Sequence, residues 1–288
     1  MKILFFLFAF FYFSISQKSN DARRVFDVHI HGSGDLKDQL LKLEQAGVYK
    51  AAISTSWNLQ NNYRGKSKIN LLYGLMFPCP NGKVPYSLQP CYEDGQEWPS
   101  VQWVEQQIKE GKIDFLGEVL NEYYGISSSD SLLFQYYAVA ERYSLPVGVH
   151  TGGAGPDHGS PNFKIEMGNP LLLERALARF PQLKVWIMHS GDQYYKETVA
   201  LMNRHPQVYA DISVISNPDI VPSAKFKIIM KTFMEAGLED RIMFGSDNGD
   251  IEKAIASVEA LYFLSGEQKD KIFFQNAERF FATARKEK

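Results

Sequence analysis

The sequence predicts an α/β fold, a single-domain (β/α)₈ TIM barrel. Eight short β-type runs alternate with helix-type stretches along the chain. The runs are apolar almost throughout, which is typical of parallel strands buried on both faces of a sheet. Eight such units over roughly 265 residues match the usual length of this barrel, which is ~250 residues. The chain has 288 residues, 45% of them hydrophobic, enough to fill one large core.

Hydrophobic periodicity places the individual elements. Strands are expected at residues 24–30, 48–54, 70–77, 113–120, 145–150, 183–189, 207–213 and 241–247. Helices with apolar residues at three- and four-residue spacing are expected at residues 36–47, 101–111, 131–143, 169–180 and 225–237. The connection over residues 55–69 is polar and gives a poor helix signal, so it is the weakest unit. Residues 265–288 are expected to close the fold with a helix and a charged tail.

A doubly wound open sheet is the competing architecture. It is disfavoured because no G-x-G-x-x-G motif follows the first predicted strand, where a dinucleotide-binding fold carries it. No internal repeat or low-complexity linker divides the chain. One barrel is therefore expected to span residues 17–288.

Residues 1–16 are predicted to be a signal peptide. One lysine precedes an apolar run from Ile3 to Phe13, and small residues follow it before Gln17. The run is far shorter than the ~20 residues that a membrane-spanning helix needs. We therefore expect an exported protein, periplasmic or secreted, without stable membrane insertion after cleavage. An uncleaved membrane anchor is the alternative.

The charge balance indicates a small-molecule substrate. The formal net charge is −2 and no long block of Lys or Arg occurs, so neither nucleic acid nor anionic lipid is expected as a partner. The two cysteines, Cys79 and Cys91, lie in a loop rich in Pro and Gly. A disulfide between them is permitted in an exported protein, and two unpaired thiols are the alternative. The oligomeric state stays open, and a homo-oligomer is allowed.

Two histidines one residue apart, His29 and His31, end the first predicted strand in the stretch VFDVHIHGSGD. Side chains at i and i+2 lie on the same face of a strand, about 6.6 Å apart. Two imidazoles in this arrangement can converge on one ion. Residues of metal-binding type also stand at or near the ends of other predicted strands. They are Glu118, His150, His189 and Asp247.

The carboxyl ends of all strands open on one face of a barrel, where catalytic groups collect. The six residues above would meet there. Imidazoles and carboxylates without cysteine suit Zn²⁺, Mn²⁺ or Fe²⁺. We expect a divalent metal site with one or two ions, and Zn²⁺ is the first choice.

Several segments resemble the amidohydrolase superfamily. FDVHIH, GVHTGG, IMHSG and MFGSD are similar to its amidohydrolase-related branch, which includes decarboxylases and lactonases. The C-terminal stretch KIFFQNAERFF is similar to the final helix of that branch. The resemblance covers nearly all of the chain after the predicted signal peptide. It implies a metal-dependent TIM-barrel enzyme.

The resemblance also implies roles for single residues. His29, His31 and Asp247 match the core ligands, and His150 matches the residue that usually completes a site for one ion. His189 matches a histidine that binds a second ion or orients the attacking water. Asp247 would act first as general base and then as general acid.

Glu118 bears on which function the resemblance favours. In FLGEV it resembles the glutamate found in TatD-type nucleases, whereas decarboxylases of the branch typically use one ion. The alternative role for Glu118 is to accept a hydrogen bond from a ligand histidine. The favoured function is a metal-dependent hydrolase that cleaves a small lactone, ester or amide. A decarboxylase and a TatD-like phosphodiesterase or nuclease are the alternatives.

Three residues are candidates for substrate contact. His158 lies in the loop after strand five, Trp57 follows strand two and Tyr124 follows strand four, all on the side of the expected metal site. Packing between loops is their alternative role. The segment 78–99 exceeds the roughly two to six residues of a usual strand-to-helix loop and is a candidate lid. His205 lies at the opposite face and is expected to be structural.

Overall fold

The computed structural model describes residues 23–92, 94–153 and 155–282. It shows one sheet of eight parallel strands in chain order. The strands are β1 (Val25–Ile30), β2 (Val48–Thr55), β3 (Asn70–Phe77), β4 (Phe115–Val119), β5 (Val147–Val149), β6 (Val185–Ile187), β7 (Val208–Asp211) and β8 (Ile242–Met243). The predicted signal peptide, residues 1–16, lies outside the described residues.

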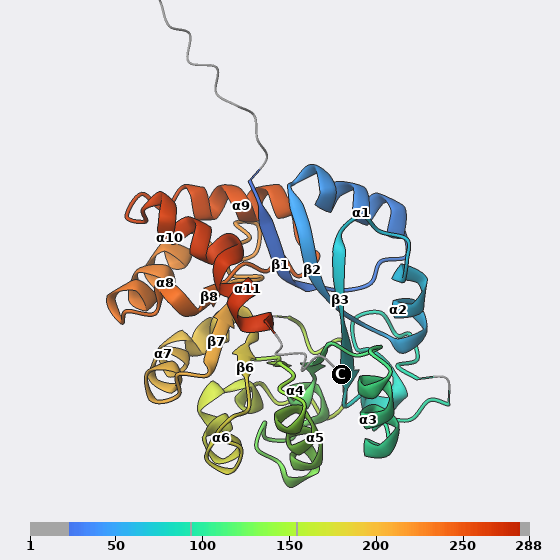
Figure 1. The fold of residues 1–288 in the computed structure, drawn as a ribbon. Coiled ribbons are helices and arrows are strands. Elements are labelled where there is room, and N and C mark those ends of the chain that lie inside the picture. The colour runs from blue at the N-terminus through green and yellow to red at the C-terminus, as the bar shows by residue number, and fades with distance from the viewer. Residues whose placement is uncertain (1–22, 93, 154, 283–288) are drawn as a thin grey trace, which may run out of the picture.

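Backbone hydrogen bonds join the first and last parts of the sheet. The amide of Val28 donates to the carbonyl oxygen of Phe244 (2.9 Å), and the amide of Asp247 donates to that of His29 (2.7 Å). The sheet is therefore a nearly closed barrel, with helices arranged around it (Figure 1). This confirms the prediction of an α/β barrel.

Helices connect most of the strands. They are α1 (Leu36–Gln45), α2 (Trp57–Tyr63), α3 (Val101–Lys109), α4 (Asn121–Tyr124), α5 (Ser131–Arg142), α6 (Glu174–Arg179), α7 (Tyr195–Arg204), α8 (Ser223–Glu235), α9 (Ile251–Glu259), α10 (Gly266–Asp270) and α11 (Asn276–Phe281). Shorter helical turns include η2 (Ile165–Gly168) and η4 (Met188–Tyr194). Across the described ranges, none of the helices is both long enough and apolar enough to span a membrane.

The structure shows a helix, α2, in the connection where periodicity gave a poor signal. Ser56 caps it, since its Oγ accepts a hydrogen bond from the amide of Leu59. Gln60 is fully buried, and its Nε2 donates to the carbonyl oxygen of Gly74 (2.6 Å). A helix that is held by a cap and a buried polar contact lacks the broad apolar stripe that periodicity detects.

Aromatic side chains fill the amino-terminal end of the barrel. Phe26 from the start of β1, Phe115 from the start of β4 and Trp186 from β6 all pack against Phe281 of α11, with ring centroids 5.3, 6.0 and 5.3 Å away. The three strand residues are fully buried, and Phe281 is 6% exposed. Because α11 covers this end, the polar groups of the interior are left at the carboxyl ends of the strands.

Candidate metal centre

The six side chains predicted as metal ligands lie at or just beyond the carboxyl ends of the strands. His29 is in β1, Glu118 is in β4, and the other four follow the ends of β1, β5, β6 and β8. All are buried except Asp247, whose side chain is 20% exposed. Their donor atoms form three overlapping groups, each within 4.8 Å, that could hold a metal ion. The fold therefore brings together all six.

The first set of contacts, here named the His31 group, contains His31, His29, Asp247 and Glu118. His31 Nε2 lies 2.9 Å from Asp247 Oδ1, 3.3 Å from His29 Nε2 and 3.6 Å from Glu118 Oε2. His29 Nε2 is 3.7 Å from Asp247 Oδ1. His31 Nε2 thus has a second imidazole nitrogen and two carboxylate oxygens within 4 Å.

The second set, here named the His150 group, contains His150, His189 and Glu118. His150 Nδ1 lies 2.5 Å from Glu118 Oε1 and 3.4 Å from His189 Nε2. His189 Nε2 is 3.8 Å from Glu118 Oε1. Glu118 therefore has Oε2 beside His31 and Oε1 beside His150, so one carboxylate belongs to both groups.

Hydrogen bonds behind the rings decide which nitrogen faces the centre. His31 Nδ1 lies 2.7 Å from the carbonyl oxygen of Ser54, and His29 Nδ1 lies 3.1 Å from Asp211 Oδ2. Because these oxygens only accept, Nδ1 carries the proton, and Nε2 is the nitrogen that would offer its lone pair to a bound ion. Glu118 Oε2 is buried and has no hydrogen-bond partner among the described residues. Converging lone pairs and carboxylate oxygens fit a divalent cation.

The carboxylates and rings shift one another's ionisation. Burial by itself would lower the pKa of His29, but the negative charges of Asp247 and Asp211 outweigh it and raise this pKa to about 10. Burial would raise the pKa of Asp247, but His29 and His31 outweigh it and lower this pKa to about 2. The centre thus favours an ionised Asp247 and a positively charged His29, and a bound cation would replace the positive charge of that ring.

Two residues that sequence analysis missed orient the rings. Asp211, the fully buried last residue of β7, accepts hydrogen bonds from His29 Nδ1 and from the amide of His189 (2.9 Å). Ser213 Oγ lies 3.0 Å from His29 Nδ1 and 2.9 Å from His189 Nδ1. Such contacts fix the tautomer and direction of ligand histidines. The sequence did contain a signal for Asp211, because the run QVYADIS places this acidic residue near the end of a predicted strand, as with the six predicted ligands.

The three candidates for substrate contact lie in different surroundings. His158 is exposed, and its ring centroid lies 6.0 Å from that of Tyr123 and 6.1 Å from that of Tyr86. The ring of Trp57 in α2 packs against that of Trp103 in α3, with the ring centroids 4.8 Å apart. Tyr124 donates a hydrogen bond to Glu97 Oε2 (2.7 Å), a residue of the candidate lid.

Two further tyrosines border the ligands: Tyr123, which the sequence places after strand four with Tyr124, and Tyr86, which was not predicted. The ring centroid of Tyr123 lies 5.0 Å from that of His150. Tyr86 lies 4.6 Å from the ring of His31, and its hydroxyl is 2.8 Å from His31 Nδ1. Tyr86, Tyr123 and His158 therefore form an aromatic wall beside the two ligand groups, whereas Trp57 and Tyr124 make their aromatic contacts elsewhere.

Tyr86 belongs to a loop that a disulfide closes between Cys79 and Cys91. The amide of Cys91 also donates to the carbonyl oxygen of Gly82 (2.9 Å), and that of Val84 donates to Gln89 (2.9 Å). These bonds make the tip of the candidate lid a small tied hairpin. The disulfide thus decides between the two alternatives that the sequence left open.

Removing the disulfide is expected to destabilise the protein. The double variant Cys79→Ser/Cys91→Ser should lose about 3 kcal/mol of unfolding free energy, because a loop of this size is no longer closed in the unfolded chain. Urea unfolding of both proteins, with and without reductant, measures this. Reductant should move the wild type to the midpoint of the variant and leave the variant unchanged. Equal midpoints under oxidising conditions would contradict the expectation.

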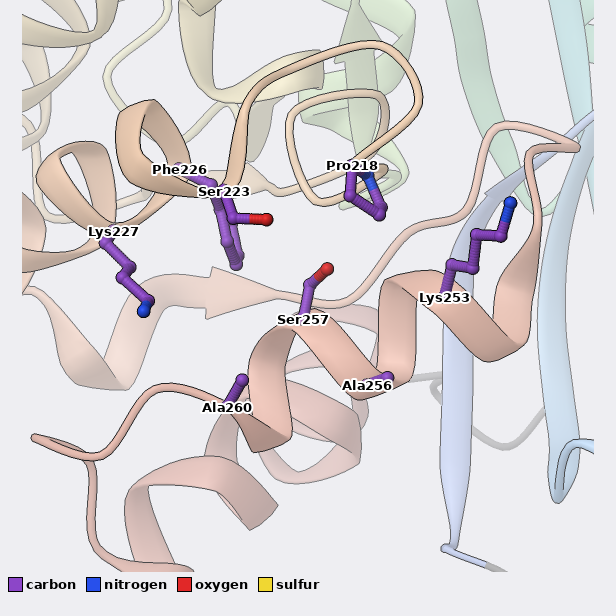
Figure 2. Close-up of a pocket in the computed structure, with 8 residues that line it drawn as sticks. All are labelled: Pro218, Ser223, Phe226, Lys227, Lys253, Ala256, Ser257 and Ala260. Carbon is purple, nitrogen blue, oxygen red and sulfur yellow. The ribbon is translucent and has the colours of Figure 1, made fainter.

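Two hollows lie outside the ligand groups. One, of about 310 Å³, lies between α8 and α9, away from the ligands (Figure 2). It is lined by Pro218, Ser223, Phe226, Lys227, Lys253, Ala256, Ser257 and Ala260. The other, of about 670 Å³, includes Ser33, Gln39, Ser246 and Asn248. Ser246 and Asn248 precede and follow Asp247 in the chain, but none of the six predicted ligands is among the residues that line this hollow.

Solved structures of low sequence identity share the fold. An uncharacterised TIM-barrel protein from Bordetella bronchiseptica has a TM-score of 0.67 and 16% identity, covering 91% of this chain and 99% of that one. An amidohydrolase from Burkholderia multivorans with bound zinc has a TM-score of 0.61 and 12% identity, and the match covers 91% of this chain and 100% of that one. A 2,6-dihydroxybenzoate decarboxylase from Rhizobium has a TM-score of 0.61 and 11% identity, and the match covers 90% of this chain and 98% of that one. No curated protein matches the chain.

The family is shown by a different comparison. The model of the family described as Amidohydrolase matches residues 117–283, more than half of the 288-residue chain. The matched segment contains Glu118, His150, His189 and Asp247. The resemblance inferred from the sequence is thereby confirmed, and the chain belongs to the amidohydrolase family.

Proposed function

We propose that the protein is a metal-dependent hydrolase that cleaves a small-molecule lactone, ester or amide. The observation that carries this proposal is the division of the Glu118 carboxylate between the His31 group and the His150 group. That division supports two divalent ions, with Zn²⁺ as the first choice. Membership of the amidohydrolase family supports a hydrolytic or lyase-type enzyme.

The residues would divide the work as follows. The His31 group would hold one ion and the His150 group the other. When bound, a divalent ion would lower the pKa of a water molecule and polarise the substrate oxygen. Asp247 would accept a proton from the attacking water and return it to the leaving group, since its side chain is the partly exposed one. His189 would help to hold and orient the reacting groups.

We also propose a place for the substrate and for the protein. His158, with Tyr86 and Tyr123, would contact the substrate through the aromatic wall, where ring faces can bury its apolar part. For Trp57 and Tyr124 the observed packing against other aromatic and lid residues supports a structural role. The disulfide supports export to an oxidising compartment, periplasmic or extracellular.

Metal counting on a Glu118→Gln variant tests the proposal. The wild type should hold two ions per chain, and the variant should hold fewer because an amide is a poorer bridging ligand. Turnover should fall by more than the roughly 10- to 100-fold cost of losing an outer-shell partner. Elemental analysis and a panel of lactones, esters and amides provide the measurements. Glu166→Gln is the control, since Glu166 is exposed and outside both groups.

A decarboxylase is the second candidate, favoured by the structural likeness to the Rhizobium 2,6-dihydroxybenzoate decarboxylase. The same experiment separates the two. A single ion per wild-type chain, with release of CO₂ from an aromatic carboxylate and no hydrolysis of the panel, would replace the hydrolase by the lyase. Turnover of DNA that stops when a chelator is added would favour the TatD-like nuclease instead.

A further inference from the structure

The side chain of Glu122 is a buried carboxyl group without an evident role in either ligand group. Glu122 lies in α4, which begins directly beyond β4, and is fully buried. Neither of its carboxylate oxygens has a hydrogen-bond partner among the described residues. Buried carboxylates in folded proteins are almost always hydrogen-bonded or paired, so this one requires an explanation.

The nearest basic group is a ring of the metal centre. Glu122 Oε2 lies 3.9 Å from His150 Nε2, and within the described part of the chain no other basic side chain comes within 4.0 Å of this carboxylate. His150 Nε2 is also buried and also has no hydrogen-bond partner there. Two unsatisfied buried groups, one able to donate and one able to accept, therefore stand opposite each other.

The other side of the same ring faces the ligand group. His150 Nδ1 is 2.5 Å from Glu118 Oε1, so the imidazole stands between two glutamates. A ring that offers the lone pair of Nδ1 to a cation must carry its proton on Nε2. That N–H then points to Glu122. The 3.9 Å separation exceeds an ordinary hydrogen bond by about 1 Å, so the contact requires a shift of one side chain or a bridging water molecule.

The surroundings hold the Glu122 carboxylate in this place. Its Oε2 approaches Gly168 of η2 so closely that a Cβ atom there would lie 2.2 Å from it. The backbone carbonyl oxygen of Glu122 also accepts hydrogen bonds from the amides of Gly125 (3.1 Å) and Lys164 (3.2 Å). Because any larger residue at position 168 would clash with the side chain of Glu122, glycine there leaves room for the carboxyl group beside His150.

We propose that Glu122 is a positioning residue for His150, accepting the Nε2–H and so directing Nδ1 to the ion of the His150 group. The inference rests on the proposed function, because it needs an ion at that group. A carboxylate behind a ligand histidine fixes the tautomer of the ring and raises its basicity. Glu122 would thus strengthen metal binding through His150, whereas Glu118 would itself be a metal ligand.

The test compares zinc affinity in the full chain with Glu122→Gln, Glu122→Asp and the control Glu166→Gln. Glu166 is the same residue type and lies close enough to Glu122 to act on it electrostatically, but it is exposed and outside both ligand groups. Competition with a chromophoric chelator measures each dissociation constant. In Glu122→Gln one of two zinc sites should weaken about 10- to 100-fold, while the other site and the control stay unchanged. In cobalt-loaded protein the visible spectrum should change for the same variant.

The outcomes are separable. A wild type that binds no zinc overturns the proposed function and this inference together. A wild type that binds two ions, with equal affinities in Glu122→Gln, overturns this inference alone. If Glu122→Gln does not fold, Glu122→Asp tests the inference instead, because it keeps the carboxyl group on a side chain that is one methylene shorter. Weakened binding in folded Glu122→Asp supports the role of Glu122, and unchanged binding refutes it.

Discussion

The Asp247→Asn variant is expected to lose turnover by about 10³-fold and to keep its fold. Asparagine retains the size of aspartate and one oxygen for the contact with His31 Nε2, now 2.9 Å away. Its amide cannot accept and return a proton, so general acid–base catalysis is lost. Turnover of the best substrate from the panel, together with circular dichroism, measures both expectations.

Metal content must be followed in the same experiment. Asp247 also ranks among the predicted ligands, so the variant is compared at saturating zinc, where a weakened site is still filled. The control is Asp219→Asn, an exposed aspartate that pairs with Lys253 outside the centre. Full turnover in Asp247→Asn would show that another group moves the proton.

The Asp211→Ala variant is expected to have the largest effect on stability. Asp211 accepts hydrogen bonds from His29 Nδ1, Trp186 Nε1, the amide of His189 and both the amide and the hydroxyl of Ser213. All of these donors are buried, and truncation leaves them without their acceptor. The free energy of unfolding should fall by about 3–5 kcal/mol, the usual cost of removing one partner from a buried charged network.

Urea unfolding followed by fluorescence and circular dichroism checks this value. Asp219→Ala is the matched control, since an exposed ion pair contributes no more than about 1 kcal/mol. Zinc affinity should fall as well in Asp211→Ala, because His29 and His189 lose the group that orients them. A variant as stable as the control would mean that the network is not what holds β6, β7 and the rings together.

Strand boundaries show where local pattern stops being informative. The sequence predicts His150 and His189 as the last residues of their strands, but the structure ends β5 at Val149 and β6 at Ile187. His189 has a left-handed backbone conformation (φ 60°), as has Asp247 (φ 51°). Such a conformation leaves the strand ladder and recurs at functional sites. Apolar runs thus locate the strands, while four of the six predicted ligands lie beyond the strand ends.

Adjacent aromatic residues show a second limit of prediction from sequence. Tyr123 and Tyr124 are adjacent on α4, and successive side chains of a helix point about 100° apart. The sequence places both near the mouth of the barrel, and our selection of Tyr124 had no means of knowing which one turns inward. The structure sets Tyr123 beside His150 and Tyr124 against Glu97. Tyr86 could not be placed either, since its position depends on how the disulfide-closed loop folds back.

The sequence by itself determined the barrel and indicated that six metal-binding-type residues would gather at one end, because apolar periodicity is local and every parallel strand of a barrel ends at the same face. Only the tertiary structure decided how the ligands are divided and aimed. Glu118 splits its oxygens between two groups, His29 is oriented by Asp211 from 182 positions away, and Glu122 stands behind His150. These contacts join residues that no local pattern relates, so packing alone sets them.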